Sequence, residues 1–415
     1  MTRSPFIVAF VLLVFFVISI ITNIAGPLIP EFIDTFELSL GMAGFLPFSF
    51  FAAYAVMSIP SGLFMERYGE RRVLAGGFGI AFAGSFAFAL WPQYGVGLAS
   101  VFLIGIGMAM LQVTLNPMLR AAGGERHFAF NSVLTQLVFG VGSFISPRVY
   151  SYLVGPAGLP WNSVYWLFSA LTLLMIAVVL AAPIPRIART AGERTGGWAA
   201  HASLLRHPHV RLYAAGIFSY VAMEQGVANW ISQFLHEYHG LDPRTSGAAT
   251  ISAFWGLMTV GCVIGLVMLK LFDSRKVLMA ATAAAIVALT AALFGTARVS
   301  TLAFPLVGFC ASVMWSIIFS LALNSVVEHH ASLSGILCTA VVGGAVGPLV
   351  IGWQGDLVGL RAAMLLLNVP LVYILSIGFW ARPLVTNATI RSEKAVSYED
   401  AAHMPDGGAR RRRDV

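Results

Sequence analysis

Charged side chains are scarce in this chain, and their scarcity bounds its class. Only 10% of the 415 residues are Asp, Glu, Lys or Arg, and 58% are hydrophobic, whereas a soluble domain carries roughly 25% charged residues. Most of such a surface cannot face water, which excludes an ordinary soluble protein. The hydrophobic runs are continuous, as in residues 6–21, and do not alternate with polar residues, which excludes an outer-membrane barrel.

Cysteine is almost absent too. Cys262, Cys310 and Cys338 lie in hydrophobic runs without CxxC or Cys/His spacing. We interpret them as small core residues and expect neither a metal site nor a disulfide. The sequence shows no nucleophile paired with a base, and it shows no phosphate-binding loop. We therefore expect no enzyme activity and no cofactor.

What the chain has is a series of hydrophobic runs, each long enough to cross a bilayer as a helix of about 20 residues. They predict an all-α integral membrane protein with twelve transmembrane helices. We place them at 6–29, 43–65, 73–91, 96–119, 128–153, 162–183, 211–236, 247–270, 277–296, 300–327, 333–358 and 361–381. The first run is expected to be retained rather than cleaved as a signal peptide. The segment after it is expected to be an outer loop carrying Glu31, Asp34 and Glu37.

The formal net charge of +7 is explained by topology, so nucleic acid is not an expected partner. Lys and Arg gather in alternate loops, and the basic residues that fall on the other side are Arg148, Arg244, Arg298 and Arg361. The positive-inside rule then predicts an inner-membrane protein with both termini in the cytoplasm. Membrane lipids are expected partners, and we expect a monomer.

One polar segment, 184–210, interrupts the apolar pattern and is rich in Arg, Gly, Pro and His. It predicts a cytoplasmic linker between two six-helix bundles, 1–183 and 211–384, as a duplicated unit would need. The polar residues 385–415 predict a disordered cytoplasmic tail.

Two loops at matching places in the halves each carry an acid followed by a base. The loop after the eighth helix contains Asp273 and Arg275, and the one after the second helix contains Gly62, Glu66, Arg67, Gly69, Arg71 and Arg72. They predict a conformational clasp, with Gly62 giving a close helix entrance; a plain charged loop is the alternative. The loop after the second helix resembles the major facilitator superfamily signature G-x-x-x-D-R-x-G-R-[RK], with Glu66 for the usual Asp.

Further strings resemble the fucose:proton symporter family, which includes glucose/galactose transporters. They are NIAGPLIPEF from residue 23, GMAMLQVTLNPML from 107, SYVAMEQGVANW from 219, FSLALN from 319 and the glycine-rich stretch from 334. The resemblance implies the two-bundle fold, alternating access and a monosaccharide substrate such as a hexose. The family's two coupling carboxylates fall at Gly26 and Gln112 here, and neither residue can take up a proton.

Polar side chains inside the membrane are costly unless they are used, so the few present are candidates for a central site. Glu224, near the middle of the seventh helix, is the candidate for coupling to Na⁺ or H⁺ and for sugar binding; a neutral structural Glu is the alternative. The other candidate substrate ligands are Asn23, Gln112, Asn116, Gln136, Gln225, Asn229, Trp230, Trp315 and Asn324. Interhelical bonding or packing is the alternative for each of these.

Arg148 lies in the outer part of the fifth helix and either extends to the interface or pairs with an outer acid such as Asp34, Glu37 or Asp356. The function predicted from the whole pattern is secondary transport of a small polar solute. A facilitative sugar uniporter, a drug or metabolite exporter and a sugar sensor without transport remain as alternatives.

Overall fold

The computed structural model describes residues 5–123, 128–184, 204–325 and 330–381, and these fold into helices without a strand. The predicted tail 385–415 and most of the linker 184–210 lie outside this part. The first group of helices is α1 (Pro5–Thr22), α2 (Ala25–Phe36), α3 (Leu40–Tyr68), α4 (Glu70–Leu90), α5 (Tyr94–Gly123), α6 (Phe128–Val154) and α7 (Ser163–Ala181).

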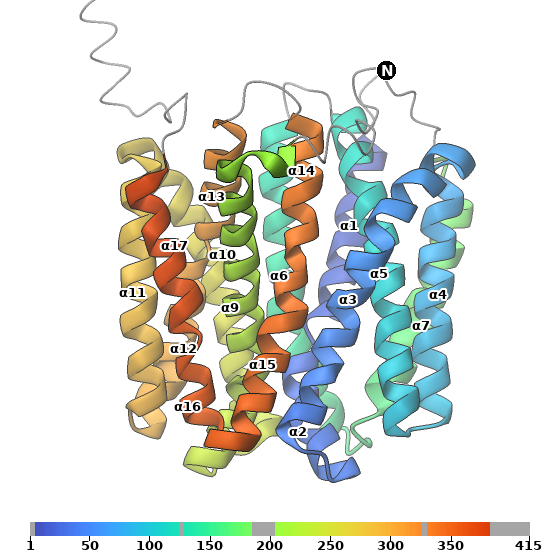
Figure 1. Ribbon diagram of the computed structural model, residues 1–415. Helices are drawn as coiled ribbons and strands as arrows, with labels where there is room; N and C mark the ends of the chain where they lie inside the picture. Colours follow the sequence, from blue (N-terminus) through green and yellow to red (C-terminus); the bar gives the residue numbers. More distant parts are fainter. Residues whose placement is uncertain (1–4, 124–127, 185–203, 326–329, 382–415) are drawn as a thin grey trace, which may run out of the picture.

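The second group follows the linker and runs roughly parallel to the first (Figure 1). It contains α9 (Pro208–His239), the π-helical turn η3 (Pro243–Gly247), α10 (Ala248–Leu271), α11 (Ser274–Phe294), α12 (Ala297–Ala311), α13 (Met314–Leu323), α14 (His330–Thr339), the 3-10 turn η4 (Ala340–Val342), α15 (Gly343–Val358), α16 (Leu360–Leu365) and α17 (Asn368–Trp380).

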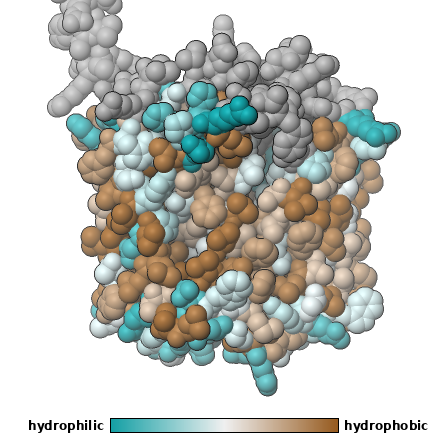
Figure 2. All heavy atoms as spheres, viewed as in Figure 1, coloured by the Kyte–Doolittle hydropathy of each residue, from teal (hydrophilic) through white to brown (hydrophobic). Residues whose placement is uncertain are grey.

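Eleven spans in the described residues are long and apolar enough to cross a membrane. The 32-residue helix α9 is not among them because polar side chains occupy its middle, and with it the spans number twelve. Figure 2 shows hydrophobic side chains over the middle of the visible face and hydrophilic residues toward both ends. The prediction of an all-α membrane protein is therefore confirmed, and each predicted helix overlaps one span.

Two spans break at a place that proline explains. The first span breaks at Asn23 and Ile24, between α1 and α2, and the last at Leu366 and Leu367, between α16 and α17. Pro27 and Pro370 each lie four residues after the start of a break. Because proline has no N–H, it cannot bond the carbonyl four residues earlier, and its ring crowds that carbonyl.

The predicted outer loop with Glu31, Asp34 and Glu37 is wrong for its first part. After the break the chain turns helical again as α2, which ends only at Phe36. Pro30 is accommodated inside that helix, and Glu31 is buried. The first part of the predicted loop is therefore the second half of one bent span.

The two groups of helices touch along a restricted set of contacts. α1, α4, α5 and α7 have their substantial contacts within the first group, and α11, α12, α13 and α17 have theirs within the second. The groups meet chiefly where α3 packs on α15, α6 on α10, and α2 on α9. Two hydrophobic cores follow this division, one drawn almost wholly from residues 10–182 and the other from 204–381.

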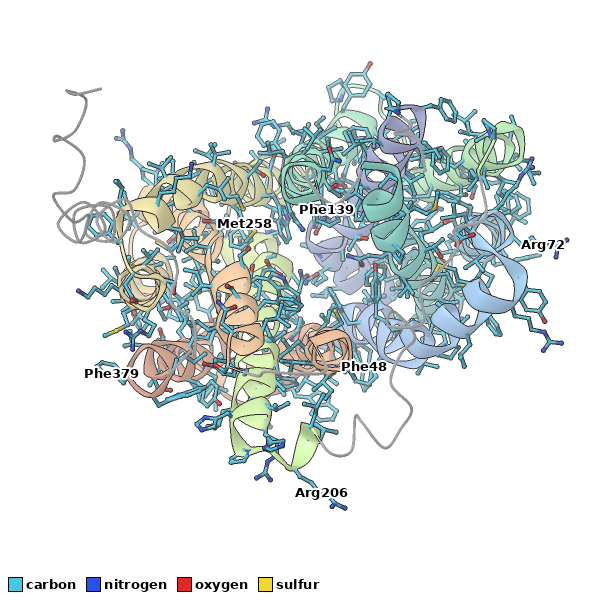
Figure 3. The ribbon with its side chains drawn as sticks, turned by 90° about the horizontal axis from the view of Figure 1, so that it is seen from above. Phe48, Arg72, Phe139, Arg206, Met258 and Phe379 are labelled. Carbon is cyan, nitrogen blue, oxygen red and sulfur yellow. The ribbon has the colours of Figure 1, made fainter. Side chains whose placement is uncertain are left out.

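The two ends of the molecule need names. We call the end where α3 gives way to α4 the basic face, since Arg67, Arg71 and Arg72 lie there with the start of α1 (top of Figure 1). Viewed from this end, Arg72 and Arg206 lie at the rim and point away from the centre (Figure 3). The opposite end, where α2 ends and α3 begins, is the gate face.

Candidate transport site and gate

Glu224 lies in the middle of α9, which begins at Pro208 and ends at His239. Its side chain is half-buried and it accepts two hydrogen bonds. The Tyr220 hydroxyl donates to Oε1 at 2.5 Å, and the Gln225 amide donates to Oε2 at 3.4 Å. The carboxyl is thus held by polar partners on its own helix, as a carboxyl at membrane depth requires.

Gln225 and Asn229 extend this polar group along α9. The Asn229 amide donates to the carbonyl oxygen of Gln225 at 2.8 Å and to its side-chain oxygen at 3.2 Å. Gln225 also faces a cavity of about 40 Å³ whose other wall, including Thr22, Phe50 and Phe51, comes from the first group. This volume has room for only a few waters, and its lining is mostly apolar.

Trp315 on α13 lies beside the same part of α9. Its ring centre is 6.0 Å from that of Tyr220 and 6.0 Å from that of Phe319, with which it stacks. Trp315 and Phe319 are both half-buried, so part of each ring is accessible. The second group therefore places a partly accessible aromatic surface beside Tyr220, the residue whose hydroxyl binds Glu224.

Asn23 does not point into the site. It is buried at the break between α1 and α2, where its amide donates to the Ser19 carbonyl at 3.1 Å and to Ser143 Oγ on α6 at 2.9 Å. Ser146 on α6 donates to the Ile20 carbonyl. The Ser19 carbonyl also keeps the backbone bond from Asn23 N at 3.2 Å. The Asn23 and Ser146 side chains therefore add donors at the break and tie it to α6, which is an interhelical role.

The remaining candidates are scattered. Trp230 is fully buried and its indole N–H donates to the Pro348 carbonyl at 3.0 Å, which is a packing role. Gln112 is half-buried in α5, Gln136 is exposed on α6, and Asn324 is half-buried at the end of α13 near the basic face. Asn116 belongs to α5, and its side chain lies outside the described residues.

The gate face holds an ion pair that joins the two groups. Glu31 on α2 accepts from Arg244 Nε at 2.6 Å and Nη2 at 3.0 Å. Its side chain is only 7% exposed, and the hydroxyl of Tyr150 on α6 donates to the same carboxylate. Charge-assisted bonds of this kind are stronger than neutral ones, and burial reduces their screening.

A second tie at the gate face joins α15 to the beginning of α3. The carboxylate of Asp356 accepts from the backbone N–H groups of Leu40 and Gly41, each at 2.8 Å. Ser39 accepts from Met42 N at 3.2 Å. A helix begins with free N–H groups and a partial positive charge, so a carboxylate from the other group caps it well.

Arg148 and Gly26 make two further contacts between the two groups of helices. Arg148 lies over the Phe144 ring at 4.4 Å and donates to Ser252 Oγ across the groups at 3.0 Å, instead of pairing with one of the acids predicted for it. Gly26 lets α2 approach α9 closely. A Cβ on Gly26 would lie 2.6 Å from the Ala228 carbonyl oxygen, so the position of the family's first carboxylate has no room for a side chain here.

The clasp residues at the basic face lie in two separate turns. Gly69 has a φ of +83° between α3 and α4, a conformation that glycine adopts without strain. Arg67 lies 5.3 Å from the centre of the Tyr68 ring, and Arg71 and Arg72 are exposed. The Glu66 side chain is outside the described residues.

The predicted close helix entrance at Gly62 is wrong for this conformation, because none of the described residues lies within 4 Å of a Cβ placed there. In the second turn Asp273 pairs with Arg275 at 3.3 Å and caps α11. Partial burial opposes ionisation of Asp273, but its bonds to Arg275 outweigh this and hold the pKa of Asp273 below its ordinary value.

Sequence reasoning missed Tyr220, Phe319 and the cluster of Glu31, Tyr150 and Arg244 at the gate face. Tyr220 and Glu224 are four apart on one helix and therefore neighbours, so the spacing could have revealed the pair. The gate had no such signal, since Glu31, Tyr150 and Arg244 are joined only by the fold.

Two groups of membrane-spanning helices that meet at the gate face, with a carboxyl in the middle of α9, have the architecture of a secondary transporter. The family model described as Major Facilitator Superfamily matches residues 11–340. The chain belongs to the major facilitator superfamily.

The chain is similar to named members of this superfamily. It is 29% identical over 375 residues to the glucose/galactose transporter of Brucella abortus biovar 1 (strain 9-941), covering 87% of this chain and 90% of that protein. It is 24% identical to the L-fucose-proton symporter of Escherichia coli (strain K12), covering 85% and 88%. A crystal structure of the E. coli fucose:proton symporter matches with a TM-score of 0.65 at 20% identity over 90% of this chain and 98% of that one. The predicted family resemblance is confirmed.

Proposed function

We propose that this protein is a cation-coupled transporter of a monosaccharide, a hexose such as glucose or galactose, that works by alternating access. The observation that carries this proposal is Glu224 in the middle of α9, held by Tyr220 and Gln225, with the Trp315 ring packed on Tyr220. A sugar offers hydroxyls to such acceptors and an apolar ring face to the indole. The names of the two relatives support the same substrate class.

The coupling cation that best fits these neighbours is a proton. Both groups that contact the Glu224 carboxylate are donors, the Tyr220 hydroxyl and the Gln225 amide, while the Gln225 oxygen is turned to Asn229. Hard metal cations take several oxygen ligands, whereas the neighbours of this carboxylate turn hydrogens toward it.

The positive-inside rule orients the molecule with the basic face in the cytoplasm of an inner-membrane protein. The gate face then faces outward and is shut by the Glu31–Arg244 pair and by Asp356. This is the arrangement expected when substrate and proton leave toward the cytoplasm. We propose that the protein works as a monomer.

The test is uptake of radiolabelled galactose and glucose into proteoliposomes with an imposed pH gradient. Glu224→Gln removes the only acid of the α9 mid-section and is expected to abolish accumulation while exchange without a gradient persists. The matched control is Glu237→Gln, an exposed acid on the same helix, which is expected to leave accumulation within about twofold, as for surface changes in general.

Uptake by the wild-type protein that ignores both pH and Na⁺ gradients would contradict coupling and indicate a uniporter. Accumulation driven by a Na⁺ gradient alone would show that the coupling ion is sodium and not a proton. Absence of hexose binding and uptake altogether would overturn the sugar assignment.

A further inference from the structure

The two oxygens of the Glu224 carboxylate are held unequally. Oε1 receives the Tyr220 hydroxyl at 2.5 Å, a short and strong bond, whereas Oε2 receives only the Gln225 amide at 3.4 Å, near the limit for a hydrogen bond. Oε1 is therefore occupied, and Oε2 has unused acceptor capacity. A ligand hydroxyl gains most by binding the oxygen that the protein leaves incompletely bonded.

Tyr220 is itself fixed in place. Its side chain is 5% exposed, and its ring packs at 6.0 Å from Trp315 on the neighbouring helix α13. A phenol held this way has little freedom to follow a rotating carboxylate. Since Tyr220 lies one helical turn before Glu224, its hydroxyl determines which rotamer of Glu224 is favoured.

We propose that Tyr220 is a positioning residue that holds Glu224 Oε1, so that Oε2 is presented to a hydroxyl of the transported sugar. This inference rests on the proposed function and adds to it the atom that contacts the substrate. Tyr220 acts through Glu224 and does not itself contact the sugar. Among the residues that the structure describes, the other ionisable side chain within electrostatic reach of the pair is Cys262 on α10.

The test is Tyr220→Phe, which removes one hydroxyl and keeps the ring. The half-saturating galactose concentration for exchange is expected to rise about tenfold, the equivalent of one charge-assisted hydrogen bond. The pH at which accumulation falls to half is expected to move upward by about one unit, because the ionised carboxylate loses a donor. The maximal exchange rate per folded molecule is expected to change little.

The matched control is Tyr213→Phe. Tyr213 is a buried tyrosine on the same helix whose hydroxyl meets Ser325 Oγ at 3.1 Å, away from any carboxylate. This variant is expected to keep the wild-type half-saturation and pH profile. A purely structural role of Tyr220 would lower thermal stability or yield and leave both quantities unchanged, and that result would overturn the proposal.

Infrared difference spectroscopy of the wild-type protein gives a second measurement that needs no folded Tyr220 variant. Adding galactose is expected to shift a carboxylate stretching band that is missing in Glu224→Gln, because Oε2 gains a donor. If the wild type transports galactose and this band does not move, the proposal falls while the transport function stands. If the wild type neither binds nor transports a hexose, both fall.

Discussion

The gate face and the basic face of this protein are built from similar charged residues, but they use them differently. At the gate face, Glu31 and Asp356 each bind a partner in the other group of helices. At the basic face, the Asp273–Arg275 pair lies within one group. The comparison teaches that a charged residue controls the conformation only when its partner belongs to the other group of helices. The distance of the charged residue from the substrate does not matter.

The largest effect is expected from adding a side chain at the gate face where α2 and α9 lie in close contact. Gly26→Ala places a Cβ 2.6 Å from the Ala228 carbonyl oxygen and 3.0 Å from Ile251 Cδ1, so α2 and α9 cannot meet as they do now. Initial proton-driven galactose uptake in proteoliposomes is expected to fall by about tenfold or more, the consequence of roughly 1–3 kcal/mol of overpacking.

The control for this experiment is Gly79→Ala on α4, where nothing in the described residues lies within 4 Å of the new Cβ. Its uptake is expected to stay near the wild-type rate. Equal uptake by the two variants would show that the close contact at Gly26 does not limit the cycle.

An intermediate effect is expected from the double variant Glu31→Gln, Asp356→Asn, which removes both charges that tie the groups together. Charge-assisted bonds contribute roughly 1.5–3 kcal/mol each, so the population with an open gate face is expected to rise by about tenfold or more. The opening is measured as the distance between two spin labels, attached at Gln93→Cys and Thr296→Cys in a protein without its native cysteines. Pulsed electron paramagnetic resonance gives the distribution of this distance.

Asp34→Asn provides the control, because Asp34 is an exposed acid on the same helix α2. Its distance distribution is expected to match that of the parent protein. A double variant with an unaltered distribution would show that packing, rather than charge, keeps the gate shut.

The smallest effect is expected at the basic face. Asp273→Asn keeps the helix cap but removes the charge, and it is expected to lower stability by less than about 1 kcal/mol, as for exposed ion pairs, without changing the spin-label distances. Because the folded-state pKa of Asp273 lies below its ordinary value of 3.8, the pair contributes stability above that value and loses it as the pH falls further.

The measurement for Asp273→Asn is a thermal-shift comparison in detergent at several pH values. The difference from wild type is expected to stay constant from pH 8 to pH 5 and to fade only below about pH 4. A difference that vanishes already near pH 6 would contradict the assigned pairing.

The spans were predictable from sequence because the bilayer fixes the length and apolarity of each helix. The exception is α2, where Pro27, Pro30 and Glu31 have the composition of a loop although they form a helix. Buried proline and glutamate become acceptable only once Tyr150 and Arg244 surround them, and these partners come from helices remote in sequence.

The candidate site was predictable only in part. Glu224 could be singled out because it is a lone acid far from both ends of its hydrophobic run. Asn23 could not be assigned correctly, because its direction is set by the helix break that it helps to satisfy. The role of Gly62 depends on which conformation the two groups adopt, and a sequence pattern does not specify that.

The break at Asn23 and Ile24 has a further consequence for the speed of the transport cycle. Bending an intact helix ruptures backbone hydrogen bonds. Here the Ser146 side chain bonds the Ile20 carbonyl, and the Asn23 side chain adds a second donor to the Ser19 carbonyl beside the backbone N–H of Asn23. Rotating α2 about this break therefore ruptures few backbone hydrogen bonds and costs little enthalpy. The activation barrier for exposing the outer side then resides in the contacts that α2 leaves behind, and its height can be tuned by surface substitutions without rebuilding the helix.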